Sequence, residues 1–242
     1  MRLKMLQDNW NRMGEQDPLW AVASDPDYRG GRWDEDAFFA TGRETITTVL
    51  DEAAARGLEV PRGAAFDFGC GVGRLSQALA DHFEQVTGAD IAPAMLEHAR
   101  GYNRHGDHVT YVLNDRPDLS RWESSSFDFV LSEITLMHME PKYFCSYIAE
   151  FLRICRPGGL IVFQLPGRRR RQAIREKIPG PIWDLVMKVR TRRSPRMEIY
   201  GMDPPALREF VAEHGGRVED EVELELEGVH EINRRYFVRP SA

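Results

Sequence analysis

The chain has 242 residues, 42% of them apolar, and a formal net charge of −6 at pH 7. This length and composition are typical of one globular domain with a full core. Its apolar runs are far shorter than the ~20 residues that cross a bilayer, and the opening residues MRLKMLQDNW lack the apolar core of a signal peptide. We therefore expect a cytoplasmic protein without stable membrane insertion. The acidic balance argues against general binding of nucleic acid.

The three cysteines, Cys70, Cys145 and Cys155, are scattered along the chain. They form no C-x-x-C pair, and no histidine accompanies them at the spacing of metal ligands. The sequence thus predicts neither a disulfide framework nor a metal site.

Residues 1–45 form an aromatic-rich segment that is interrupted by glycines. Its aromatic side chains include Trp20, Tyr28, Trp33 and Phe38. Such a segment is too apolar for a free tail. We expect a helical arm that packs over the rest of the domain and covers a ligand cleft.

Residues 46–166 alternate short apolar runs with amphipathic stretches, the pattern of a parallel sheet covered by helices. Apolar periodicity predicts helices near 46–54, 75–83 and 144–155, the last one stopped by Pro157-Gly158-Gly159. The five expected strands cover residues 64–69, 85–90, 108–113, 126–134 and 160–166.

The rest of the chain contains a basic insertion and a C-terminal unit. Residues 167–200 hold eleven Lys or Arg against three acidic residues, a local charge of +8. Residues 201–242 predict a helix over 204–214 and strands over 217–226 and 234–239. No internal repeat or long linker divides the chain, so we predict a single domain over residues 1–242.

The stretch FDFGCGVGR, residues 66–74, places a glycine-rich turn directly after the first strand of the expected sheet. Such a turn opens a helix and exposes backbone N–H groups to a ligand. Gly69, Gly71 and Gly73 give G-x-G-x-G rather than the dinucleotide pattern G-x-G-x-x-G. This spacing argues against a nicotinamide or flavin cofactor.

Two acidic residues narrow the ligand further. Asp90 closes the second strand, where a carboxylate can accept hydrogen bonds from both vicinal hydroxyls of a ribose. Asp67 lies just before the glycines, where it would repel phosphates but attract a cationic amino group. An adenosine that carries an amino acid, as S-adenosylmethionine does, satisfies both demands.

Four motifs occur in order: FDFGCGVGR followed by Asp90, then NDRPDL (114–119), FDFVLSEITLMH (127–138) and RICRPGGLIVFQLP (153–166). Together they resemble the motif set of class I S-adenosylmethionine-dependent methyltransferases, over residues 45–238. The resemblance implies an α/β fold with a Rossmann-like, doubly wound, seven-stranded sheet. The sheet would be mostly parallel with its last strand antiparallel, helices would cover both faces, and the basic insertion would follow the fifth strand.

The resemblance also implies roles for individual residues. The methionine end of the cofactor would lie against Asp67, Gly69 and Gly71, and Asp90 would hold the ribose. The adenine contacts and the sulfonium neighbour would be Ile91, Asp115, the Arg116 backbone and Ser132. A plain turn cap in NDRPD is the alternative interpretation of Asp115.

The acceptor of a methyl group is expected beyond the end of the fourth strand. His138 could take a proton there, because an imidazole ordinarily titrates at ~6.5; the alternative is a structural histidine before the next helix. Glu133 could take a direct catalytic role, or orient the cofactor or an acceptor amine. His230 and Glu231 are more distant candidates.

Three interpretations of the basic insertion, residues 167–200, stay open. Its arginines could bind an anionic acceptor through bidentate pairs. Its apolar run with flanking cations could dock on an anionic membrane. It could also be a solvated face that pairs with acidic parts of this chain or of a second subunit.

The sequence therefore predicts S-adenosylmethionine-dependent transfer of a methyl group to a hydroxyl, amine or carboxylate of a small metabolite. An anionic metabolite would be compatible with the arginines of the basic insertion. The fourth strand ends in SEITLMH and lacks the N/D-P-P-Y/F motif of enzymes that methylate nucleic-acid bases, so a small-molecule acceptor is favoured over DNA or RNA. The alternatives are a catalytically silent cofactor- or RNA-binding module and a nucleotide-dependent oxidoreductase. A homodimer is left open.

Overall fold

A computed structural model describes residues 3–167, 178, 199–224 and 233–241. They contain a seven-stranded sheet in the order β3-β2-β1-β4-β5-β7-β6. Strands β1 to β5 are parallel, and β7 runs antiparallel to both of its neighbours. This confirms the predicted fold class. The strands are β1 (Ala64–Phe68), β2 (Gln85–Asp90), β3 (Val109–Leu113), β4 (Phe127–Ser132), β5 (Cys155–Pro166), β6 (Gly216–Leu224) and β7 (Asn233–Pro240).

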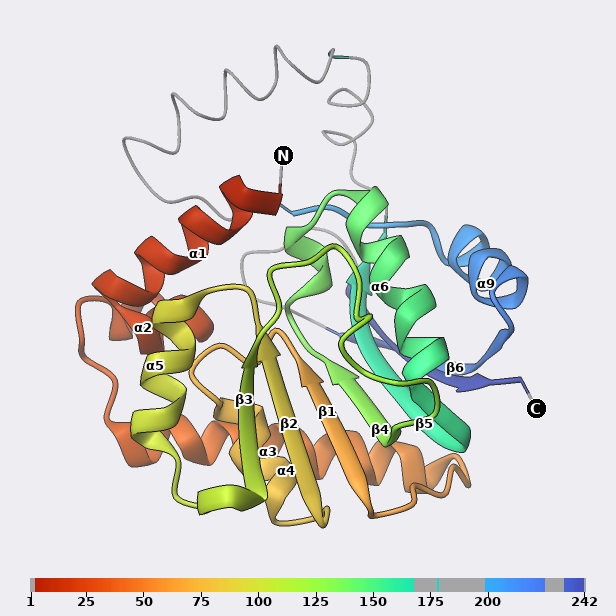
Figure 1. Ribbon diagram of the computed structural model, residues 1–242, viewed down its shortest axis with the longest axis horizontal. Coiled ribbons are helices and arrows are strands. Elements are labelled where there is room, and N and C mark those ends of the chain that lie inside the picture. Colours follow the sequence, from red (N-terminus) through yellow and green to blue (C-terminus); the bar gives the residue numbers. More distant parts are fainter. Residues whose placement is uncertain (1–2, 168–177, 179–198, 225–232, 242) are drawn as a thin grey trace.

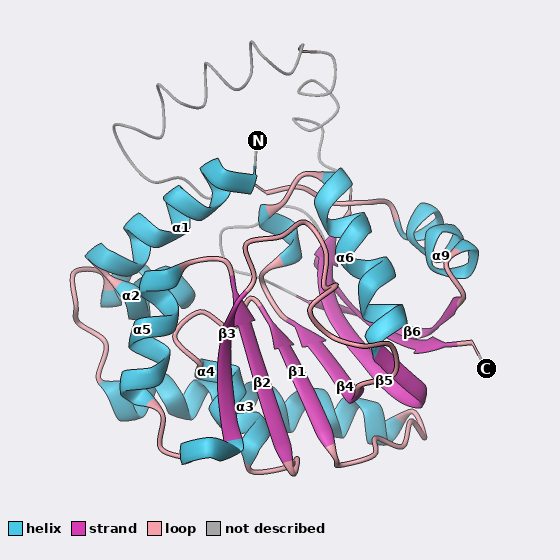
Figure 2. Cartoon of the chain, in the orientation of Figure 1, coloured by secondary structure: helices cyan, strands magenta, loops and turns pink. Residues whose placement is uncertain are grey.

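Helices cover both faces of this sheet (Figures 1 and 2). The α-helices are α1 (Leu3–Gln16), α2 (Pro18–Val22), α3 (Glu35–Ala55), α4 (Arg74–Ala80), α5 (Pro93–Tyr102), α6 (Pro141–Ile154) and α9 (Pro204–Glu213); η1 (Pro26–Tyr28), η2 (Gly106–His108) and η3 (Leu136–His138) are short 3-10 helices. One face packs against α3, α4 and α5, and the other against α6 and α9. Within the described residues, no helix has the length and apolar character that crossing a membrane requires.

The central strands are apolar on both sides because both sides are buried. Successive side chains of a strand point to opposite faces, so Ala65 joins the cluster with α3 and α4, whereas Phe66 joins the cluster with α6. This double burial explains the nearly continuous apolar runs that predicted the strands.

Several element boundaries differ from those predicted. Helix α3 begins at Glu35 rather than near residue 46, because the Asp34 carboxylate caps it by accepting from the Ala37 N–H at 2.9 Å. Strand β4 ends at Ser132 rather than at Ile134, where the backbone turns into the left-handed region.

The glycine pair after α6 has a different role from the one predicted. Helix α6 ends at Ile154 and the chain enters β5 at once, at Cys155. The pairing of β5 with β4 then jumps from Cys155 to Leu160. Pro157-Gly158-Gly159 therefore lies in an irregular part of β5 instead of forming the loop between helix and strand.

The first part of the predicted arm lies across the carboxyl ends of the parallel strands, whereas residues 35–45 belong to α3. Figure 1 shows α1 and α2 at this end of the sheet, and residues of the arm pack with the glycine turn and α5 through Met13, Phe39, Val72 and Met95. The basic insertion, apart from its ends and residue 178, and His230 and Glu231 lie outside the described residues.

Candidate cofactor and acceptor site

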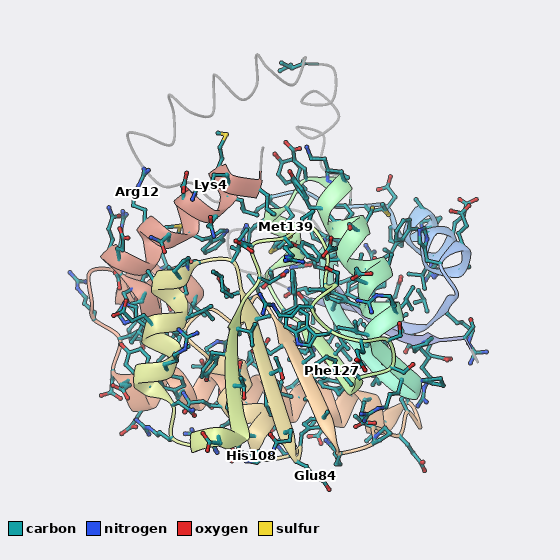
Figure 3. The ribbon with its side chains drawn as sticks, viewed as in Figure 1. Lys4, Arg12, Glu84, His108, Phe127 and Met139 are labelled. Carbon is teal, nitrogen blue, oxygen red and sulfur yellow. The ribbon has the colours of Figure 1, made fainter. Side chains whose placement is uncertain are left out.

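A pocket lies where the loops after β1, β2, β3 and β4 meet the N-terminal arm. Met139, labelled in Figure 3, marks this end of the sheet, whereas Glu84 and His108 mark the opposite end. The empty space of the pocket is about 950 Å³, its open mouth included.

The glycine turn after β1 forms the floor of the pocket. Gly69, Gly71 and Gly73 have φ values of +78°, +53° and +84°, which side-chain-bearing residues rarely adopt. A Cβ on Gly69 would collide with the Thr135 side chain, and one on Gly73 with the Tyr111 ring. The turn therefore needs glycine for its backbone shape and for the close approach of neighbouring side chains.

Asp90 is held rigidly at the end of β2. Its Oδ2 accepts from the Gly71 N–H at 2.9 Å and its Oδ1 from the Ala92 N–H at 2.8 Å. A carboxylate has about four acceptor positions, so each oxygen can still accept one hydroxyl. Asp90 and Ile91 both line the pocket, and this geometry fits a ribose diol.

Asp67 is buried below the glycine turn and lines the pocket. The Ser76 hydroxyl donates to its Oδ2 at 2.6 Å. Burial raises the pKa of Asp67 to about 6, although Ser76 and the nearby Arg74 oppose this change. A cationic group in the pocket would stabilise the ionised carboxylate.

Arg74 is a buried cation that the sequence analysis did not single out. Its side chain lines the pocket, and its Nη1 donates to the hydroxyls of Thr41 and Thr45 at 3.2 and 3.3 Å. Among the described residues no carboxylate forms an ion pair with it, and its buried Nε has no hydrogen-bond partner. Asp67 and Glu133 attract this cation from nearby without an ion pair, so the site fits an anionic ligand group that would pair with Arg74 directly.

The position of Arg74 in the sequence could have marked it as a functional residue. It is the first residue of α4, and a cation at a helix N-terminus opposes the helix dipole. A basic residue directly after a glycine turn therefore needs an explanation other than helix stability.

The loop after β3 presents a different residue from the two predicted. Asn114 is buried and lines the pocket, and its backbone N–H donates to the Asp90 carbonyl at 2.9 Å. Asp115 and Arg116 are exposed and lie outside the pocket lining. The Asn114 side chain in turn holds this loop together, since its Nδ2 donates to the Asp118 carbonyl at 3.2 Å.

Ser132 is the last residue of β4, and Glu133 follows it. The polar groups of both side chains are engaged in hydrogen bonds within the protein. Ser132 is fully buried below the lining, and its hydroxyl donates to the Phe68 carbonyl at 3.1 Å. Glu133 lines the pocket, but Arg235 donates to both of its oxygens at 2.9 Å and to Glu52 at 2.7 Å. A carboxylate held in such a fork is poorly suited to accept a proton.

His138 closes the acceptor side of the pocket. It is 6% exposed, and its ring stands edge-on to Trp10 of α1 with 5.2 Å between the ring centroids. Leu6 and Met139 complete an apolar wall around it. Both predicted catalytic residues thus line the pocket, but of the two only Glu133 is held in a fork of hydrogen bonds from Arg235.

Comparison with known proteins shows which sequences and folds this chain resembles. Residues 66–163 match the family model described as a methyltransferase domain. Over 113 residues, the chain is 34% identical to a ubiquinone biosynthesis O-methyltransferase of Xanthomonas campestris pv. campestris, covering 46% of each chain. It is 31% identical over 137 residues to the protein of that name from Hahella chejuensis, covering 56% of each. The chain thus matches about half the length of these curated relatives.

The overall fold also has solved counterparts. The crystal structure of magnesium protoporphyrin IX methyltransferase from Synechocystis PCC 6803 with bound SAH covers 98% of this chain and 99% of its own, with a TM-score of 0.66 and 19% identity. At this identity the likeness concerns the fold. The family match over residues 66–163, the fold and the pocket all agree with a class I, S-adenosylmethionine-dependent methyltransferase domain.

Proposed function

We propose that this protein transfers a methyl group from S-adenosylmethionine to a hydroxyl oxygen of a small, largely apolar molecule. The observation that supports this most directly is His138, a histidine in an apolar wall of the pocket. A hydroxyl acceptor needs a base because it carries its proton at neutral pH. The relatives named O-methyltransferases agree with an oxygen rather than a nitrogen as the acceptor atom, and of the two oxygen acceptors expected, only a hydroxyl needs a base.

The pocket offers a chemical match to each part of this cofactor. Arg74 would pair with its carboxylate and Asp67 with its amino group, while Asp90 would accept from the ribose hydroxyls. Ile91 and Asn114 lie where the adenine would follow. When bound, S-adenosylmethionine supplies a methyl group on a cationic sulfur, which leaves as a neutral thioether.

His138 and the apolar residues around it would align the hydroxyl and receive its proton. A ring nitrogen of His138 would accept this proton as the oxygen forms its bond to the methyl carbon. The apolar surfaces of Leu6, Trp10 and Met139 would exclude water and hold the acceptor in line. The protein itself forms no covalent bond in this scheme.

The first experiment compares binding of S-adenosylhomocysteine and NAD by calorimetry. We expect micromolar binding of S-adenosylhomocysteine, and binding of NAD alone would refute the proposal. A second experiment screens metabolite fractions for release of S-adenosylhomocysteine. Binding without release from any fraction would favour the silent-module alternative.

A histidine variant tests the base. His138→Gln should lower the methyl-transfer rate about 100-fold or more and leave the affinity for S-adenosylhomocysteine unchanged. His82→Gln is the matched control, because His82 is exposed and outside the pocket lining. A variant at His138 that keeps the full rate would remove it from the mechanism.

A further inference from the structure

Ile134 has a backbone conformation that a β-branched residue rarely adopts. Its φ is 55°, and among the described residues Ser125 is the one other non-glycine with a positive φ. The left-handed region is sterically unfavourable for a β-branched side chain. Ile134 is also 37% exposed and lines the pocket, so burial of its side chain does not explain the conformation.

Contacts from distant elements hold the loop 133–135 in place. The Arg235 guanidinium of β7 binds both oxygens of Glu133. The Ile134 N–H donates to Oε1 of buried Gln164 in β5 at 3.0 Å. The Thr135 hydroxyl lies 3.4 Å from the Gly69 carbonyl and donates to the Glu133 carbonyl at 3.0 Å. Strained residues persist where their surroundings determine them in this way.

This loop lies on the acceptor side of the pocket. Strand β1 separates β4 from β2 in the sheet, so the glycine turn lies between Ile134 and Asp90. Ile134 shares the pocket lining with Trp10, His138 and Met139. Aromatic and thioether side chains favour flat, ring-bearing partners.

We propose that Ile134 is an acceptor-specificity residue, held in its left-handed conformation so that its apolar side chain contacts the ring substituents of a phenolic acceptor. This inference rests on the proposed function and deepens it. The apolar contact at Ile134 would select among acceptors, while His138 would receive the proton.

The test substitutes Ile134 by residues that accept a positive φ. Ile134→Asn and Ile134→Gly should relieve the backbone strain, so each variant should melt at or above the temperature of the parent protein. Ser125→Gly is the matched control, since Ser125 shares the φ of 55° but is exposed before β4 and outside the pocket lining.

Activity is measured with catechol, methylcatechol and tert-butylcatechol as probes. We expect the parent protein to prefer the bulkier probes in kcat/KM, and Ile134→Asn to lower that preference about 10-fold, the scale on which apolar pockets discriminate alkyl groups. The affinity for S-adenosylhomocysteine should stay within about twofold of the parent value. Ser125→Gly should change neither quantity.

Three results would overturn the inference. One is an equal loss of activity with all three probes; another is a melting temperature of both Ile134 variants well below that of the parent protein. The third is a parent protein that binds S-adenosylhomocysteine but methylates none of the phenols. Failure to bind S-adenosylhomocysteine would instead refute the proposed function, and the melting comparison would still test the strain at Ile134.

Discussion

Two walls of the pocket contain left-handed backbone, and they reach it by different means. We call the glycine turn with Asp67 and Asp90 the cofactor wall, and the loop 133–135 with Trp10, His138 and Met139 the acceptor wall. The cofactor wall uses Gly69, Gly71 and Gly73, for which a positive φ carries no Cβ penalty. The acceptor wall uses Ile134, which is held there by contacts from β5 and β7. The first wall is a local property of five residues, whereas the second depends on residues up to 102 positions away in the chain. The acceptor wall can therefore vary with the packing around it while the cofactor wall stays the same.

The largest loss of stability is expected when the cation that pairs with Glu133 in the acceptor wall is removed. Arg235→Met would leave Glu133 buried without its partner and should cost about 3–5 kcal/mol of stability in urea unfolding. The control is Arg217→Met on the edge strand β6, whose exposed side chain pairs with Glu219; it should cost at most about 1 kcal/mol. Equal losses in the two variants would mean that the pair at Glu133 has no special role.

The next effect concerns the cofactor wall and depends on pH. The pKa of Asp67 is about 6 in the folded protein against an ordinary 3.8, so the folded state holds this proton more tightly than the unfolded state. The ionised carboxylate then costs about 3 kcal/mol of stability above pH 6. Asp67→Asn should be more stable than the parent protein by up to this amount at pH 8, and the gain should shrink as the pH falls from 6 toward 4.

Urea unfolding at pH 8 and pH 4.5 measures this difference. Exposed Asp81→Asn is the control and should show no such trend. Asp67→Asn should also bind S-adenosylhomocysteine more weakly, because the ionised carboxylate is lost as a partner of the amino group. A stability gain that is the same at both pH values would contradict the assignment.

A smaller effect, on ligand binding, distinguishes the carboxylate end of the proposed cofactor site from its ribose end. Arg74→Met should weaken binding of S-adenosylhomocysteine by about 1.5–3 kcal/mol, the value of a hydrogen-bonded charged partner. Binding of adenosine, which has no carboxylate, should be unchanged. Calorimetry with both ligands measures this, and an equal loss for both would place Arg74 elsewhere in the site.

The complementary variant is Asp90→Ala. Both S-adenosylhomocysteine and adenosine carry the ribose, so both should lose about 1–3 kcal/mol of binding free energy. Calorimetry under the same conditions provides the comparison. An unchanged affinity for adenosine would remove Asp90 from the ribose contact.

Much of the cofactor wall could be predicted from the sequence because its determinants are close together in the chain. The glycine turn, Asp67 and Asp90 follow directly from strands whose apolar runs are easily recognised, and the structure places all of them around the pocket. The loop after β3 shows the limit of this approach. NDRPD contains several polar residues, and only the direction of the turn selects Asn114.

The acceptor wall was harder to predict because its key contacts are long-range. A strand was expected to continue through Ile134, since its apolar side chain extends the alternating pattern. Glu133 looked like a base, since nothing near it in the sequence announces Arg235. The hydrogen bonds between Glu133, just after β4, and Arg235 of β7 become visible only when the antiparallel strand is placed in the sheet.

The position of β7 between β5 and β6 has a consequence for assembly during synthesis. Domains generally fold as units during synthesis, but the strands that carry Asp67 and Asp90 are synthesised first, since β2 ends at residue 90. Glu133 emerges about a hundred residues before Arg235. The two carboxylates proposed to hold the cofactor are therefore synthesised long before the ion pair at Glu133 can form, because that pair requires β7 to insert between β5 and β6.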